Sequence, residues 1–165
     1  MYIYQNLPRQ YLDNIGGTLA KIQLLSANAS PVGDFEHLNY PEDNLLVADD
    51  SFIALNDFKT FGLIMDTTSY ESGIVDVDGD LVTETVFKGK MPRVTLAGIQ
   101  VCSSFVKSRC LAIVTDRNGL RRILGRKEAP AVFKFKEVTG ERFESLNNIE
   151  IQINITHEFS PAFLP

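Results

Sequence analysis

The feature that most constrains the fold is a strict alternation of apolar and polar residues between positions 149 and 156. The odd positions are all isoleucine, and the even positions are Glu150, Gln152, Asn154 and Thr156. A period of two places successive side chains on opposite faces of a β-strand. This segment therefore predicts a strand in a sheet that has one buried face and one polar face.

Two further extended segments precede this strand. Ala131, Phe133 and Phe135 alternate with Val132, Lys134 and Lys136. Earlier, an apolar run over residues 111–114 leads into Asp116-Arg117-Asn118-Gly119 and returns over residues 120–124. Asn-Gly between two apolar runs favours a hairpin, because both residues tolerate the positive φ of a tight turn. Together the three segments predict one antiparallel sheet with one buried face.

A second hairpin is predicted over residues 70–88, with its turn at Asp78-Gly79-Asp80. Asp-Gly is also a favoured pair for a two-residue turn. The alternating aspartates at 76, 78 and 80 resemble the start of a calcium loop. Leu81 stands where that loop needs glycine, and Phe87 stands where it needs a bidentate glutamate, so the pattern disfavours calcium.

The remaining segments complete a single domain over residues 1–165. Residues 18–25 predict the first strand, and residues 60–66 predict a buried strand. Between them, residues 26–59 lack periodicity and predict a long irregular acidic arm. Residues 94–109 predict one helix, in which Leu96, Ile99, Cys102 or Ser103, and Val106 recur every three to four residues as an apolar stripe, with Phe105 alongside. The predicted fold is mainly β: an antiparallel β-sandwich or partly closed barrel, with one packed helix and the acidic arm.

Charge is unevenly divided along the chain. Residues 1–92 carry five Lys/Arg and fourteen Asp/Glu, whereas residues 93–165 carry eleven and seven. The acidic candidates for contact between subunits are Asp34, Glu36, Glu42, Asp43, Asp49 and Asp50, and the basic candidates are Arg117, Arg121, Arg122, Arg126 and Lys127. We expect the acidic arm of one copy to contact the basic hairpin of the next. Two alternatives stay open: solvated faces of a monomer, and contact of the basic hairpin with phosphates.

The sequence offers no pattern typical of an enzyme, and it predicts no cofactor and no metal site. His37 and His157 lie outside any nucleophile or metal-ligand motif. Cys102 and Cys110 are expected to be reduced and partly buried. The first residues do not resemble a signal peptide, and no segment is apolar for the length of a bilayer, so we expect a cytosol-like compartment and no membrane partner.

A series of turn residues over residues 60–165 resembles small structural proteins of tailed bacteriophages that infect Bacteroidetes, crAss-like phages included. The series consists of Asp78-Gly79-Asp80, Pro92, Asp116-x-Asn118-Gly119, Leu124-Gly125, Pro130, Thr139-Gly140 and Asn148-x-Glu150-x-Gln152-x-Asn154. In those proteins, a similar series closes a β-domain that assembles into neck or tail rings.

The resemblance implies a non-enzymatic virion protein, assembled in the host bacterial cytoplasm. It would form a closed ring of six or twelve copies, or a tube, as a head–tail connector, a tail-completion protein or a tail-tube subunit. Its partners would be further copies, adjacent virion ring or tail proteins and, without sequence specificity, DNA that passes through a lumen. Residues 26–59 would act as a clasp between subunits. The alternative function is a cellular soluble β-sandwich that binds a protein or a small ligand.

Overall fold

The structure is a computed structural model, and it describes residues 18–29, 35–37, 46–48, 51–140, 147–157 and 162–164. The strands are β1 (Thr18–Ser26), β2 (Phe35–His37), β3 (Leu46–Ala48), β4 (Lys59–Gly62), β5 (Ser69–Val77), β6 (Asp80–Pro92), β7 (Cys110–Asp116), β8 (Arg121–Leu124), β9 (Val132–Val138), β10 (Asn148–His157) and β11 (Ala162–Leu164). The helices are α1 (Ser51–Leu55), α2 (Leu96–Ser108) and a short 3-10 helix, η1 (Ala27–Ala29).

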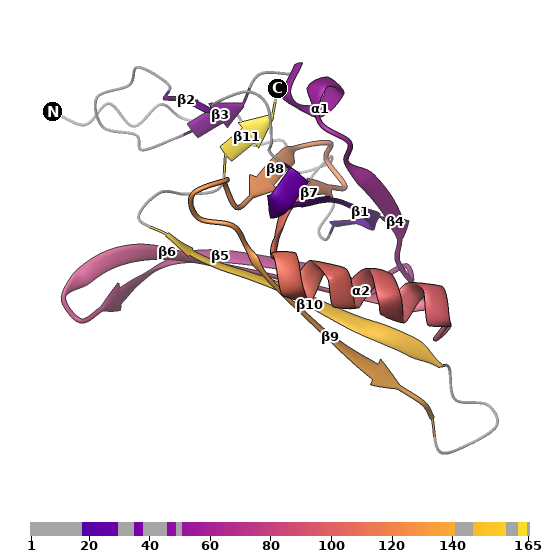
Figure 1. The fold of residues 1–165 in the computed structure, drawn as a ribbon. Coiled ribbons are helices and arrows are strands. Elements are labelled where there is room, and N and C mark those ends of the chain that lie inside the picture. Colours follow the sequence, from indigo (N-terminus) through magenta and orange to yellow (C-terminus); the bar gives the residue numbers. More distant parts are fainter. Residues whose placement is uncertain are drawn as a thin grey trace, which may run out of the picture.

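The strands form two sheets that pack face to face as a sandwich (Figure 1). One sheet has seven strands in the order β2-β3-β11-β8-β7-β1-β4, and the other has four in the order β5-β6-β10-β9. Neighbouring strands are antiparallel except for β11 and β3, which are parallel. The sheets do not close into a barrel, so of the two predicted architectures the sandwich is the correct one.

The main core lies between the two sheets and α2. Ile151 and Ile153 from β10 face inward, as their alternation predicted, together with Phe133 from β9. Phe105 of α2 connects the sheets, because its ring lies 6.0 Å from the ring of Phe61 on β4 and 5.7 Å from that of Phe133. The helix therefore closes one side of the sandwich, where the two sheets diverge (Figure 1).

A second apolar cluster covers the opposite face of the seven-stranded sheet. Its buried members are Leu25, Phe52, Leu111, Ile113, Ile123 and Leu164, and Phe52 comes from α1. In β7 the residues alternate between the two clusters: Ala112 and Val114 enter the main core, while Leu111 and Ile113 enter the second. The centre of the larger sheet is thus buried on both faces, which explains why β7 is apolar at consecutive positions.

The three C-terminal segments do not form one sheet, contrary to the sequence-based expectation. The β7–β8 hairpin belongs to the seven-stranded sheet, whereas β9 and β10 belong to the four-stranded sheet. The chain crosses between the sheets just after β8, where Gly125 has φ +87°. There Cys110 and Ala131 exchange two backbone hydrogen bonds of 3.1 and 2.8 Å. This isolated antiparallel bridge stabilises the crossing between the two sheets.

The two predicted hairpins form, but their turns differ. Asp78 and Gly79 both have positive φ, 55° and 94°, as a two-residue type I′ turn requires. In the second hairpin only Gly119 has positive φ, and the backbone N–H of Asp116 donates to the Leu120 carbonyl at 3.0 Å. This is a three-residue loop of the bulged kind, not the two-residue Asn-Gly turn that we expected.

The predicted helix is present as α2, and Thr95 caps it by accepting a hydrogen bond from the Gly98 N–H at 3.0 Å. Cys102 and Phe105 are its buried residues. The expected core stripe was partly wrong, because Leu96 is 73% exposed and Val106 is 46% exposed. The helix is rotated so that Phe105 points between the sheets, and this turns both residues toward solvent.

The structure describes part of residues 26–66. The segment predicted as an irregular arm contains η1, β2, β3 and α1, and its remaining parts lie outside the described residues. The strand predicted at residues 60–66 is β4, which ends at Gly62 and lies at the edge of its sheet beside β1. Because an edge strand has a neighbour on one side only, β4 is mostly exposed, and the buried apolar residue of this segment is Leu63, just beyond it.

Candidate functional site

The basic residues predicted from sequence lie along the β7–β8 hairpin and just beyond it. Arg121 and Arg122 belong to β8, which is an inner strand between β7 and β11, and both are half-buried. The Arg122 guanidinium lies 3.3 Å from Asp116 and 5.0 Å above the ring of Tyr70. Arg117, in the turn, forms an ion pair with Asp66. Part of this positive charge is therefore balanced within the chain.

The structure does not describe most of the acidic residues that were predicted to contact this basic hairpin. Asp34, Glu42, Asp43, Asp49 and Asp50 lie outside the described residues. Glu36 lies in the short strand β2. Arg126 is half-buried and Lys127 is exposed, both beyond the end of β8. Contact between the acidic segment of one copy and the basic hairpin of another stays a prediction.

The described part of the chain gathers no group of three or more His, Cys, Asp or Glu side chains that could hold a metal ion. The thiols of Cys102 and Cys110 are buried and form no disulfide. Burial raises the pKa of both, to about 12 for Cys110, so these thiols stay protonated at neutral pH. They act as small apolar core residues. Within the described ranges, no helix is both long and apolar enough to cross a membrane.

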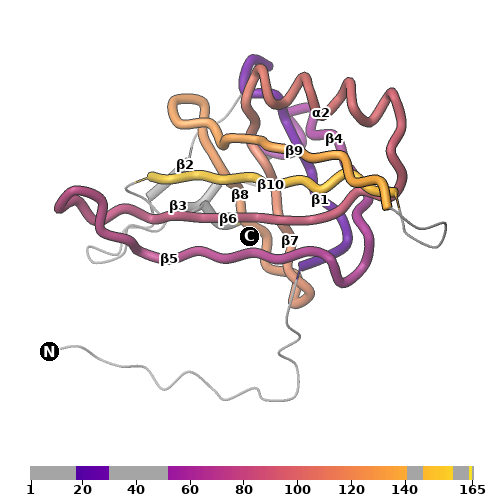
Figure 2. Tube along the Cα trace, turned by 90° about the horizontal axis from the view of Figure 1, so that it is seen from below, coloured from indigo at the N-terminus to yellow at the C-terminus, as the bar shows by residue number. Residues whose placement is uncertain are grey.

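The four-stranded sheet presents a broad polar face away from the sandwich. Viewed from below, β5, β6, β10 and β9 lie in front of the other described elements, and none of those elements covers them (Figure 2). The register explains which side chains reach this face. Glu150 pairs with Lys90 on one side and with Lys136 on the other, and Gln152 pairs with Lys88 and Lys134. Directly paired residues point to the same face, so four lysines surround two residues of β10.

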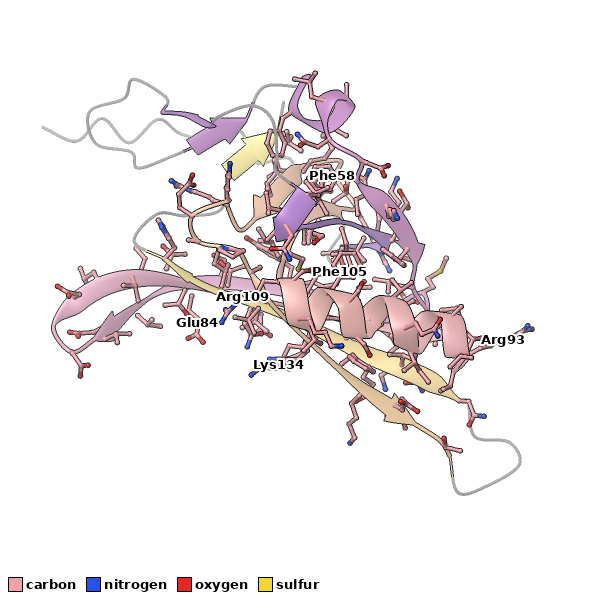
Figure 3. All side chains as sticks on the ribbon, viewed as in Figure 1. Phe58, Glu84, Arg93, Phe105, Arg109 and Lys134 are labelled. Carbon is pink, nitrogen blue, oxygen red and sulfur yellow. The ribbon has the colours of Figure 1, made fainter. Side chains whose placement is uncertain are left out.

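These side chains line a shallow groove of about 430 Å³. We call it the lysine groove; its lining includes Lys88, Lys90, Lys134, Lys136, Glu150 and Gln152. Strands lie about 4.8 Å apart, so the lysines of β6 and β9 face each other across roughly 10 Å. Figure 3 shows Lys134 pointing away from the sandwich.

Electrostatic interactions in the lysine groove favour an anion. The Lys90 ammonium lies 2.9 Å from the Glu150 carboxylate. This hydrogen bond, with the nearby positive charge of Lys136, holds the pKa of Glu150 below its usual value. Among the described carboxylates, Glu150 alone forms an ion pair with one of the four lysines, Lys90. The groove therefore keeps a net positive charge at neutral pH.

The opposite end of the same sheet is acidic and apolar. The β5–β6 hairpin extends beyond the neighbouring strands as a two-stranded arm (Figure 1). We define the hairpin arm as residues 71–84. Its acidic residues, all exposed, are Glu71, Asp76, Asp78, Asp80 and Glu84, and it contains no Lys or Arg. Ile74 is 73% exposed and Leu81 is 70% exposed, which is unusual for such large aliphatic side chains when they are neighbours.

Sequence reasoning missed both features, although each had a local signal. Lys88-x-Lys90 and Lys134-x-Lys136 each place two lysines on one face of a strand, because alternate residues share a face. What could not be read from sequence was that β10 would lie between those two strands. The acidic hairpin was predicted as a hairpin, and its aspartates were considered for calcium alone.

Comparison with known proteins gave no matching family model, no similar curated protein and no similar solved structure.

Proposed function

We propose that this protein is a non-enzymatic structural subunit that assembles with copies of itself into a ring or tube. The observation that carries the proposal is the hairpin arm, which presents Ile74 and Leu81 to solvent beyond the body of the sandwich. The two side chains are diagonal neighbours on one face, since Ile74 pairs with Thr83 and Leu81 with Asp76. A two-stranded ribbon has little core of its own. Such an arm gains stability when its apolar side chains are covered by another chain.

The free energy gained by burying these exposed side chains supports contact with another chain. Burying a large aliphatic side chain contributes about 1.5–3 kcal/mol relative to leaving it exposed. Two such residues, Ile74 and Leu81, form a compact apolar surface on one face of the arm. The edge of β5 adds to it, because this strand has β6 as its one neighbour among the described residues. An uncovered edge strand is a site for pairing with another chain.

The setting that we propose for this assembly is the neck or tail of a bacteriophage, as a connector, completion or tube protein in the virion. The resemblance of the turn series to structural proteins of such phages supports this setting, and an assembly subunit needs no catalytic group. Six or twelve copies per ring are the expected numbers from the same resemblance.

The test of self-assembly is the mass of the protein in solution, measured by light scattering, together with electron microscopy. We expect rings, tubes or discrete oligomers. Ile74→Asp with Leu81→Asp should produce folded monomers, because two carboxylates would have to be buried in the contact. Leu96→Asp is the matched control: Leu96 is equally exposed, at 73%, but lies at the start of α2, away from the arm. It should leave assembly intact.

A second candidate function is a β-sandwich module that binds an anionic protein or small ligand. The lysine groove is the observation that favours it. If the wild-type protein is a monomer at every concentration and the arm variants behave like it, self-assembly is wrong and this second function becomes the better account.

A further inference from the structure

We infer that the hairpin arm of one copy docks in the lysine groove of the next, so that the four-stranded sheet carries both halves of a head-to-tail contact. This inference rests on the proposed self-assembly and names one contact within it, made by the face of the arm opposite the one that carries Ile74 and Leu81. It differs from the contact predicted from sequence, because both surfaces belong to one sheet and all their residues lie in the described part of the chain.

The first argument is charge. The arm has five carboxylates and no cationic side chain, whereas the groove has four lysines around one glutamate. Opposite potentials on two surfaces guide their encounter and select against wrong partners. A long polyanion lying along this sheet would meet the acidic arm at one end. A second copy of the chain can place its acidic arm on the basic groove and its basic groove on the acidic arm.

The second argument is distance. Asp80 and Lys88 belong to the same strand, eight residues apart, which corresponds to about 26 Å along an extended chain. The strand is paired with β5 or β10 along its whole length, so it cannot fold back on itself. The carboxylates at the tip of the arm, Asp76, Asp78 and Asp80, therefore cannot reach the groove of their own chain, whereas Glu71 lies diagonally across from Lys88. The charges of the tip can meet a lysine groove only between molecules.

The third argument is the chemistry of the two surfaces. Lysine side chains present apolar stems as well as ammonium groups, so a groove lined by them can accept a ribbon that is both acidic and apolar. Val75 and Val82 pair directly on the arm, on the same face of the sheet as Glu71 and Glu84. Figure 3 shows Glu84 on the outer side of the sheet, as Lys134 is. Valines can cover the lysine stems while the carboxylates reach the ammonium groups.

The contact joins two different patches, so it is heterologous when it is made once between two copies. Repeating it generates a ring if the rotation between copies closes, and a helical filament or tube if it does not. Two copies that each dock an arm in the other's groove would instead form a closed isologous dimer. The inference thus explains how one sheet can produce the assemblies proposed above.

The experiment is a charge exchange. The arm variant carries Asp80→Lys and Glu84→Lys, which leaves Asp76 to accept its 2.8 Å hydrogen bond from the Gly79 N–H in the turn. The groove variant carries Lys134→Glu and Lys136→Glu. Each alone should weaken self-association on the order of tenfold or more, in a manner that depends on salt. The two variants mixed, and the chain that carries all four changes, should associate again because the charges are complementary once more.

The matched control is Lys21→Glu with Lys59→Glu, which changes net charge as the groove variant does. Both lysines are exposed on the seven-stranded sheet. Circular dichroism establishes that each variant is folded. Association that is lost in the single variants, restored in the mixture and retained in the control supports the inference.

Three outcomes overturn it. If the wild type assembles and neither charge variant alters assembly, the interface is wrong while the proposed function stands. If the wild type is a monomer, the proposed function is wrong, and this inference with it. The third outcome is measured with a fluorescent single-stranded DNA of 30 nucleotides. If the groove variant no longer binds this DNA but assembles like the wild type, the lysine groove is a phosphate-binding surface instead.

Discussion

The two central hairpins show how similar local sequences reach different environments. Each has a glycine of positive φ in its turn, and each has an aspartate whose carboxylate accepts backbone N–H groups there. The β7–β8 hairpin lies in the middle of the seven-stranded sheet and is covered on both faces, whereas the β5–β6 hairpin extends into solvent. Ile113 in the first is 1% exposed, and Ile74 in the second is 73% exposed.

The difference teaches that the turn sets the pairing of two strands, and the neighbours of the pair set its burial. β7 has β8 and β1 beside it, α1 on one side and the four-stranded sheet on the other. Among the described strands, β5 has β6 as its one neighbour, and the β5–β6 hairpin continues past the end of the core. We propose that the second hairpin is the part of the molecule that meets another chain.

The largest expected effect on stability comes from placing a carboxylate at one isoleucine of each hairpin, Ile113 of β7 or Ile74 of β5. Ile113→Asp should destabilise the protein by at least about 3 kcal/mol, because the charge would be buried in the second apolar cluster without a partner. Ile74→Asp should change the stability of the monomer by no more than about 0.5 kcal/mol. Urea denaturation followed by circular dichroism, at a concentration at which the protein is monomeric, measures both. Equal losses would show that the arm packs on its own subunit.

The next effect concerns glycines of positive φ. A Cβ on Gly125 would lie 2.7 Å from the Ala131 nitrogen and 3.1 Å from the Cys110 carbonyl oxygen, both backbone atoms at the crossing between sheets. Gly125→Ala should therefore cost roughly 3 kcal/mol or more, from left-handed strain and overpacking together. Gly119→Ala meets no atom within 4 Å and should cost about 1–2 kcal/mol from strain alone. Thermal or urea unfolding gives the ranking, and the reverse order would contradict the described crossing.

A smaller effect tests the link between the two hairpins. Arg122 of β8 lies over the ring of Tyr70 of β5 and beside Asp116, in a half-buried position. Arg122→Met should cost about 1–2 kcal/mol, because it removes the cation over the ring and the ion pair. Arg117→Met removes a more exposed pair with Asp66 and should cost about 0.5 kcal/mol or less. If the two substitutions have the same effect, the contact between hairpins contributes nothing measurable.

The smallest effect is a dependence on pH in the lysine groove. The hydrogen bond from Lys90 lowers the pKa of Glu150 below its ordinary value of 4.5. A lowered pKa in the folded state means that the ionised form stabilises the fold, so this contribution is present above pH 4.5 and is lost as the pH falls through the folded pKa. Lys90→Met should raise the pKa of Glu150 toward 4.5, as followed by NMR titration. An unchanged pKa would mean that Lys136 or backbone groups set it.

The sequence by itself determined the local elements. The alternation over residues 149–156 predicted the buried and polar faces of β10, and Asp78-Gly79 predicted a two-residue turn. These predictions succeeded because strand period and turn conformation depend on neighbouring residues in the chain. The N-terminal end of α2 was near the expected position because Thr95 supplies the cap.

The tertiary structure decided how these elements share two sheets. The rotation of α2 was set by Phe105, whose place depends on Phe61 and Phe133 from different sheets. The exposure of Ile74 and the burial of Ile113 follow from the number of neighbouring strands and layers, which no local pattern encodes. The lysine groove exists because β10 pairs with both β6 and β9, which brings together lysines more than forty positions apart in the chain. Long-range strand pairing is a property of the whole chain, so it became visible only in three dimensions.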